Sequence, residues 1–254
     1  MKYFVCKSLC LLIWLTFQMT FSQNDPQPVY VIVHGAWGGG WAFKQVDSLL
    51  TEKGALVYRP TLTGQGERVH LATSDVGLDT HINDVVNTIL FEDLHSVVLV
   101  GHSYGGMVVT GVADRVADRI KKLIYVDAFF PENGESVVSI TGDFTANGMK
   151  KVDGYVVPPW VPEGQSPPKD VPHPFKTFTD TLVLTGMQSM KIPTSYLLTV
   201  DKGKTPSEDD FASQAERAKQ KGWPVLVLEA DHNAQWSAPV AFAQMLWELG
   251  TEKK

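Results

Sequence analysis

The most informative stretch of the chain is VVLVGHSYGGM, residues 97–107. Its first four residues are apolar and predict a buried strand. A helical pattern begins at Gly105, so the Gly-X-Ser-X-Gly motif falls on a tight turn between a strand and a helix. On such a turn the Ser103 hydroxyl is exposed, as a nucleophilic serine requires. The motif alone is weak, because an ordinary turn can contain serine. Its placement between a strand and a helix is what favours a nucleophile.

Short apolar runs alternate with helical patterns along the rest of the chain. This alternation predicts the α/β class, a mostly parallel central sheet with helices on both faces. Strands are expected at Val29–His34, Ala55–Arg59, Val97–Gly101, Leu123–Ala128, Thr194–Val200 and Val225–Ala230. Helices are expected at Trp41–Lys53, Leu78–Phe91, Gly105–Ala117, Glu208–Lys221 and from about Pro239 to Leu249.

Residues 131–193 do not follow this alternation of strand and helix patterns, and they contain nine of the chain's fifteen prolines. Proline cannot donate to a β-ladder and disfavours helix interiors, so this segment is not expected to supply central strands. It follows the strand that ends near Ala128. We interpret it as a small cap inserted above the sheet. The alternative is a surface excursion without a functional part.

The first 22 residues have the order of a secretory signal peptide. Lys2 and Lys7 precede an almost wholly apolar run, and small residues stand before Gln23. The run is shorter than the roughly 20 residues that a membrane span needs, although an uncleaved anchor is the alternative interpretation. We therefore expect a mature domain over residues 23–254, secreted or periplasmic, with no stable membrane insertion.

Composition excludes several kinds of site. Both cysteines, Cys6 and Cys10, lie in the expected leader, so a mature domain has no cysteine for a thiol nucleophile, a zinc–thiolate site or an iron–sulfur cluster. The 22 basic and 28 acidic residues give a net charge of −6, and no basic patch indicates a nucleic-acid partner. No metal or organic cofactor is expected, and the sequence does not indicate an oligomeric state.

A serine nucleophile needs a histidine base and an acid that orients the histidine. In folds with a nucleophile elbow, these residues follow in the order Ser, acid, His. His232 comes just after the apolar run at 225–228, where a loop can bring it back over Ser103. Asp201 and Asp127 each follow a predicted strand, at the sheet edge where α/β proteins place their sites. We favour Asp201 and keep Asp127 as its competitor.

The oxyanion of acyl transfer needs two backbone N–H donors. Tyr104, directly after the nucleophile, is expected to supply one, and Ala36 in the loop HGAWGGG (residues 34–40) the other. His34 is expected to be a buried hydrogen-bonding residue. The candidate pocket walls are aromatic, and each could equally be core packing: Trp37, Phe129, Phe130 and Trp160.

These motifs together resemble the α/β-hydrolase superfamily. The closest resemblance is to the branch of plant methyl-salicylate esterases, hydroxynitrile lyases and bacterial pyrethroid-hydrolase-type carboxylesterases. The residues that carry it are VHGAW (33–37), PTLTGQGER (60–68), VGHSYGG (100–106), YVDAFFP (125–131) and TVDKG (199–203). The last run resembles the one that bears the acid in the plant esterases, which favours Asp201. The family's cap occupies the interval of the proline-rich segment.

The resemblance implies a serine carboxylesterase acting on small to medium apolar esters, with Ser103, His232 and Asp201 as the triad. Hydroxynitrile lyase chemistry on the same scaffold is one alternative. The lyases of this branch carry a lysine after the catalytic histidine and a threonine beside the oxyanion loop, where this chain has Asn233 and Gly35. Both departures argue against the lyase. A non-catalytic protein that binds a small ligand is the second alternative.

Overall fold

The computed structural model describes residues 27–142, 149–186 and 189–252, so the expected signal peptide lies outside the described residues. The strands of the main sheet are β1 (Val29–Val33), β2 (Leu56–Tyr58), β3 (Val97–His102), β4 (Ile120–Val126), β8 (Thr194–Val200) and β9 (Val225–Glu229). The main helices are α1 (Lys44–Glu52), α2 (Leu78–Phe91), α3 (Gly105–Arg115), α6 (Ala212–Gln220) and α8 (Pro239–Thr251). All of them match segments expected from the sequence, within a few residues at their ends.

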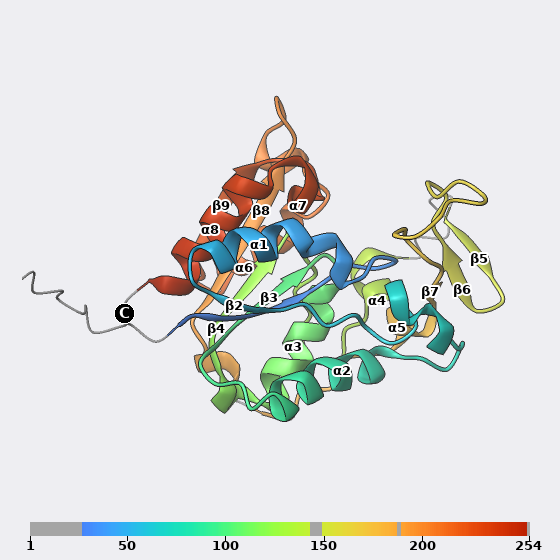
Figure 1. Cartoon of the computed structure of the whole chain (residues 1–254), viewed down its shortest axis with the longest axis horizontal. Coiled ribbons are helices and arrows are strands. Elements are labelled where there is room, and N and C mark those ends of the chain that lie inside the picture. Colours follow the sequence, from blue (N-terminus) through green and yellow to red (C-terminus); the bar gives the residue numbers. More distant parts are fainter. Residues whose placement is uncertain (1–26, 143–148, 187–188, 253–254) are drawn as a thin grey trace, which may run out of the picture.

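The main sheet has six strands in the order β2-β1-β3-β4-β8-β9, and every pairing is parallel. Successive residues of each strand face opposite sides, because side chains alternate along a strand. In β3, Val98 and Val100 pack against α1 and α8, whereas Leu99 packs in the cluster with α2 and α3. Figure 1 shows these two helical layers on opposite sides of the sheet. The α/β fold with both faces covered is therefore confirmed.

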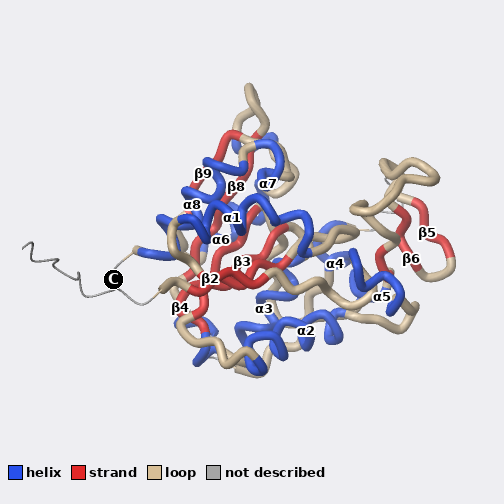
Figure 2. The backbone as a smooth tube through the Cα atoms, in the orientation of Figure 1, coloured by secondary structure: helices blue, strands red, loops and turns tan. Residues whose placement is uncertain are grey.

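The proline-rich interval forms a second, smaller structure. It contains α4 (Val137–Thr141), α5 (Lys176–Thr179) and the strands β5 (Lys150–Val152), β6 (Tyr155–Val157) and β7 (His173–Pro174). The three strands pair antiparallel in the order β5-β6-β7. They lie apart from the main sheet in Figure 2. The sequence pattern missed these strands because each has only two or three residues, too few for a period-2 signal.

Trp37, in the loop after β1, makes three hydrogen bonds to described residues of this insertion. Its indole Nε1 donates to the carbonyl of Val156 at 3.0 Å, and its backbone N–H donates to Nδ1 of His173 at 3.2 Å. The Val171 N–H donates to the Trp37 carbonyl at 2.9 Å. The insertion is thus held directly over the loop that was expected to bind the oxyanion.

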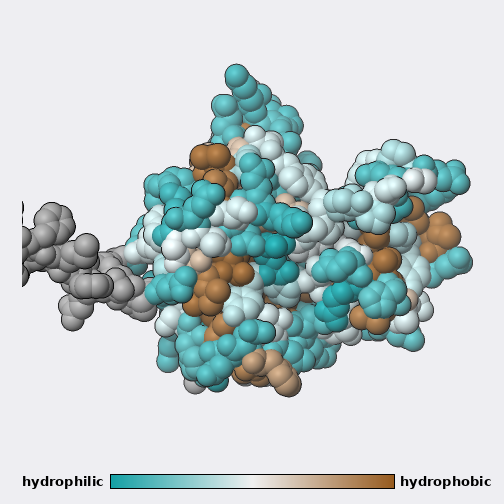
Figure 3. Space-filling model, viewed as in Figure 1, coloured by the Kyte–Doolittle hydropathy of each residue, from teal (hydrophilic) through white to brown (hydrophobic). Residues whose placement is uncertain are grey.

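The face shown in Figure 3 is mostly hydrophilic, with apolar side chains gathered in a few separate patches. Within the described part of the chain, no helix is both long enough and apolar enough to cross a bilayer.

Candidate active site

Ser103 occupies a sharp turn between β3 and α3. Its φ is +54°, in the left-handed region that residues with a side chain rarely adopt. Such a strained backbone is typical of functional sites. The main chain holds the turn on both sides, because Ser103 N–H donates to the Val126 carbonyl at 3.2 Å and Phe129 N–H donates to the Ser103 carbonyl at 3.1 Å. This is the strand–turn–helix context expected for a nucleophile elbow.

Gly105 allows the helix after this turn to approach β1. A Cβ at Gly105 would lie 2.6 Å from the carbonyl oxygen of Val33 and 2.8 Å from that of His34. Real Cβ atoms do not come so close to backbone oxygens, so this position excludes any residue with a side chain. The second glycine of the motif is therefore needed for α3 to begin directly behind Ser103.

His232 follows β9 and Asp127 follows β4, and the two side chains meet. Nδ1 of His232 lies 2.6 Å from Oδ2 of Asp127. The other carboxylate oxygen of Asp127 accepts a hydrogen bond from the Thr199 N–H at 3.1 Å, and the residue is only 1% exposed. The ring of Phe211 stacks on the His232 imidazole, with the ring centroids 5.1 Å apart. These contacts fix both the carboxylate and the plane of the imidazole.

The expectation that Asp201 orients His232 is wrong. The Asp201 carboxylate instead accepts a hydrogen bond from Nζ of Lys204 at 2.7 Å, and its side chain is 47% exposed. Both acids end a buried strand of the same sheet. Of these two acids, only Asp127 has a side chain that contacts the His232 imidazole.

His102 is a contact of His232 that sequence reasoning did not identify. Its Nε2–H donates to the backbone carbonyl of His232 at 2.8 Å, and the two ring centroids are 4.7 Å apart. Burial lowers the pKa of His102 to about 3, so the ring is neutral at ordinary pH. The signal in the sequence was the residue before Ser103, where a polar side chain interrupts an apolar strand.

The expected oxyanion donors also lie beside Ser103. A Cβ at Gly35 would be 2.9 Å from the Ser103 Cβ and 3.4 Å from its Oγ, which shows how closely the loop after β1 approaches the serine. Within the described chain, neither the Ala36 N–H nor the Tyr104 N–H donates a hydrogen bond to a backbone or side-chain acceptor. Two free donors beside a serine are what an oxyanion requires.

Buried histidines support this loop and the nucleophile turn. Leu62 N–H donates to Nε2 of His34 at 3.1 Å, so Nδ1 of His34 carries its proton and donates to the Gly35 carbonyl at 2.7 Å. Similarly, Nδ1 of His81 accepts from the Tyr104 hydroxyl at 2.9 Å. Burial lowers the pKa of both histidines to about 4. The expected role of His34 as a buried hydrogen-bonding residue agrees with these contacts.

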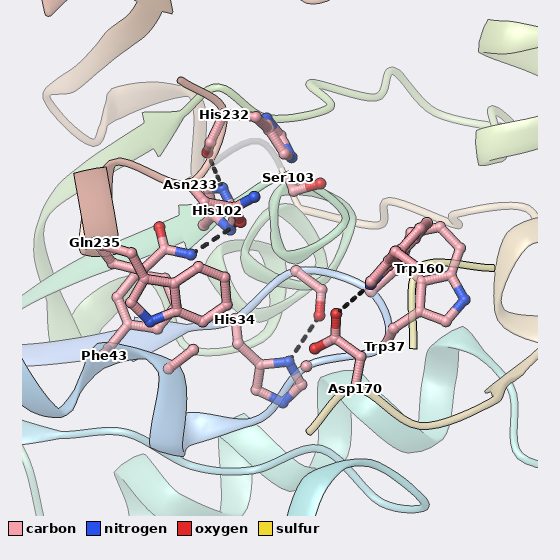
Figure 4. A pocket seen from close by; sticks show the side chains of 15 residues that line it. His34, Trp37, Phe43, His102, Ser103, Trp160, Asp170, His232, Asn233 and Gln235 are labelled. Carbon is pink, nitrogen blue, oxygen red and sulfur yellow. Dashed lines mark hydrogen bonds between the residues drawn. The ribbon is translucent and has the colours of Figure 1, made fainter. Parts of the chain in front are cut away.

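A cavity of about 330 Å³ contains both Ser103 and His232, which lie next to each other in Figure 4. Its size is within the usual range for small-molecule sites. Its lining also includes the side chains of Phe43, His102, Trp37, Trp160, Trp236 and Asp170.

Two of the four expected pocket residues, Trp37 and Trp160, line this cavity, and Phe129 and Phe130 are absent from its lining among the described residues. The Phe130 ring is in the core, where its centroid lies 4.4 Å from that of the Trp223 ring. Phe129 packs against Phe211, with ring centroids 5.1 Å apart. Sequence alone did not separate the aromatic residues of the wall from those of the core.

No group of three or more His, Cys, Asp or Glu side chains is arranged to hold a metal ion in the ranges that the structure describes.

Comparison with known sequences adds the family to this geometry. Residues 30–245 match the profile of the alpha/beta hydrolase family. The chain belongs to this family. A carbendazim hydrolyzing esterase from a Nocardioides species is 36% identical over 247 residues, which cover 87% of this chain and 99% of that protein. A pFDCC methylesterase of Arabidopsis thaliana is 30% identical over 266 residues, covering 88% of this chain and 96% of that protein.

Comparison with solved structures supports the same fold for this hydrolase. An extracellular alpha/beta-hydrolase from a Paenibacillus species superposes with a TM-score of 0.74 at 23% identity, and the match covers 89% of this chain and all of that one. The superfamily inferred from the sequence motifs is therefore confirmed, and esterases are among the relatives of this hydrolase.

Proposed function

We propose that this hydrolase is a serine carboxylesterase for small to medium apolar esters, with Ser103 as nucleophile, His232 as base and Asp127 as the orienting acid. The observation that carries the proposal is the 2.6 Å contact between His232 Nδ1 and Asp127 Oδ2, in the cavity that also contains Ser103. A carboxylate on Nδ1 leaves Nε2 unprotonated and able to accept the serine proton. The esterase relatives support the choice of an ester as substrate.

The proposed reaction has two halves. Ser103 Oγ attacks the ester carbonyl while His232 Nε2 takes its proton, and a tetrahedral oxyanion forms. The intermediate collapses, the bond to the alcohol oxygen breaks, and His232 returns the proton to the departing alcohol. Water then attacks the acyl-enzyme, with His232 again as base, and the carboxylic acid leaves Ser103 free.

The oxyanion is assigned to the backbone N–H groups of Ala36 and Tyr104. Neither N–H donates to an acceptor among the described residues, and Tyr104 is the N-cap of α3, whose N-terminal dipole favours negative charge. Removing one such donor typically lowers the rate by about 10² to 10³. The positions of these two amides therefore matter nearly as much as the triad.

The insertion at residues 131–193 is proposed to act as a cap that closes the acyl or alcohol side of the pocket. Trp160 and Asp170 from this insertion line the cavity, which supports that role. Limited proteolysis of the purified protein, with and without a covalently bound fluorophosphonate, tests it. We expect slower cleavage within the insertion after labelling, and identical cleavage patterns would contradict a cap.

We also propose that residues 1–22 are removed on export and that the mature enzyme is secreted or periplasmic. The order of positive charge, apolar run and small residues supports this. Expression of the full chain in a bacterial host, followed by N-terminal sequencing of the exported protein, is expected to give Gln23 as the first residue. An intact Met1 in the purified, membrane-bound protein would contradict cleavage.

The central test combines labelling with turnover. We expect the purified domain to react with a fluorophosphonate and to hydrolyse nitrophenyl esters of short acids, and Ser103→Ala to lose both properties while keeping the melting temperature. Failure of the wild-type protein to label would favour a non-catalytic binding protein. Release of cyanide from mandelonitrile without ester hydrolysis would favour a lyase.

A further inference from the structure

A carboxylate lies in the wall of the active-site cavity and takes no part in the proposed chemistry. Asp170, from the insertion, lines the cavity together with Ser103 and His232. One of its oxygens, Oδ2, accepts a hydrogen bond from the indole Nε1 of Trp160 at 2.7 Å. Figure 4 shows this pair on the side of the cavity away from His232.

The second oxygen of Asp170 has room but no donor. Oδ1 lies over Gly38, where a Cβ on that glycine would be 3.8 Å away, and no hydrogen bond reaches it from the described residues. Among the residues that the structure describes, neither lysine nor arginine lines the cavity. Burial raises the pKa of Asp170 above its usual value, as expected for a carboxylate partly removed from water without a cation. An unpaired acceptor in such a wall is stabilised by any donor that a bound molecule supplies.

Aromatic side chains also line the cavity. The Trp37 and Trp160 rings meet edge to face, with their centroids 5.2 Å apart. Trp236 and Phe43 belong to the same lining. An aromatic lining favours an aromatic guest, which gains both apolar burial and ring–ring contact. The cavity therefore combines an aromatic lining with one carboxylate oxygen, Oδ1 of Asp170, to which no described residue donates.

We propose that Asp170 is a specificity-determining residue that selects esters of flat aromatic groups bearing an N–H. The N–H donates to Oδ1 of Asp170 while the ester carbonyl reaches Ser103. This inference deepens the proposed esterase function and rests on it. It assigns Asp170 to substrate recognition and gives it no part in proton transfer.

A matched pair of esters tests the proposal. Methyl indole-3-carboxylate carries a ring N–H, and methyl benzofuran-3-carboxylate has nearly the same shape with that N–H replaced by a ring oxygen. We expect the wild-type protein to favour the N–H ester in kcat/KM by roughly tenfold or more, the value of a hydrogen bond to a charged acceptor. Asp170→Ala is expected to reduce this ratio to about two or less.

Trp160→Phe serves as the matched control. It removes the indole donor to Oδ2 but keeps the carboxylate and an aromatic wall, so the preference for the N–H ester should persist. If Asp170 served only to anchor Trp160, both variants would change the ratio equally, and the proposal would be overturned. Melting temperature and fluorophosphonate labelling show whether each variant is folded.

The outcomes separate this inference from the proposed function. If no ester is hydrolysed, nitrophenyl acetate included, the esterase proposal itself fails. If nitrophenyl acetate is hydrolysed but the indole and benzofuran esters are not, or are hydrolysed equally, only the assignment of Asp170 fails. A second pair of esters compares a choline ester with its uncharged 3,3-dimethylbutyl analogue. An Asp170-dependent preference for the choline ester without one for the N–H ester would show that charge is recognised, and would overturn the proposal.

Discussion

The carboxylate of Asp127 reaches past a neighbouring strand to lie 2.6 Å from Nδ1 of His232. Asp127 follows β4 and His232 follows β9, and β8 runs between these two strands. The Thr199 N–H, from β8, donates to the other oxygen of the same carboxylate. The acid is thus oriented by the strand that it crosses.

This geometry predicts a large loss of activity for one of two matched acid-to-amide substitutions and almost none for the other. Asp127→Asn is expected to lower kcat for a nitrophenyl ester by about 10³ to 10⁴, because the amide favours the wrong imidazole tautomer, as in other serine hydrolases. Asp201→Asn should stay within about twofold, since it loses only an exposed ion pair with Lys204. Steady-state kinetics check both variants, and a larger loss in Asp201→Asn would reverse the assignment.

His102 is expected to act as a positioning residue for His232. His102→Leu keeps the volume but removes the Nε2–H donor to the His232 carbonyl, so the histidine loop loses its anchor. We expect kcat to fall about tenfold or more with KM little changed, and His102→Gln, which can still donate, to recover part of the loss. A rise in KM with kcat unaltered would instead place His102 in substrate binding.

Two glycines in the loop after β1, Gly35 and Gly38, form another matched pair. Gly35→Ala places a methyl group 2.9 Å from the Ser103 Cβ, and we expect kcat/KM to fall by about 10² or more as the loop and its oxyanion donor shift. Gly38→Ala meets its nearest atom at 3.8 Å and should have a much smaller effect. Equal losses in the two variants would contradict a close approach at Gly35. Melting curves show whether a loss of activity comes from a destabilised fold or from a shift of the loop in a folded protein.

Buried neutral histidines predict a loss of stability in mild acid. Burial lowers the pKa of His34 and His81 to about 4 and that of His102 to about 3, below the usual value near 6.5. Between these values the unfolded chain binds more protons than the folded one, so stability is complete above about pH 6.5 and declines as the pH falls toward 4. We expect the melting temperature at pH 5 to be at least about 5 °C below that at pH 7.5.

The pH prediction has an internal control. His81→Gln should reduce the pH dependence because one buried histidine is removed. His95→Gln should not, because His95 is largely exposed. Calorimetry at both pH values measures this, and equal melting temperatures for the wild-type protein at pH 5 and pH 7.5 would contradict the prediction.

The strands and helices that position the site were predictable from the sequence. β3 and β8 are long apolar runs, and α2 has clear helical spacing, so local pattern and final structure agree. The turn at Ser103 was predictable for the same reason, since a buried strand and a helix flank it.

The acid was not predictable in the same way, because Asp127 and Asp201 both end adjacent parallel strands. Strand order does not specify which carboxylate turns inward. The residues after the two acids differ in polarity. The apolar Ala128 and Phe129 follow Asp127, whereas charged residues follow Asp201. The pocket wall escaped prediction because an aromatic residue suits core and cavity equally, as Phe130 and Trp160 show.

The backbone hydrogen bonds around Ser103 and Asp127 run entirely within the main sheet and its turns, through Val126 and Leu197. The insertion at residues 131–193, in contrast, contributes Trp160 and Asp170 to the cavity lining. In the roles proposed above, the reaction centre and part of the substrate recognition belong to separable parts of one chain. Exchange of that interval between relatives offers a route to new substrate preferences without rebuilding the reaction centre.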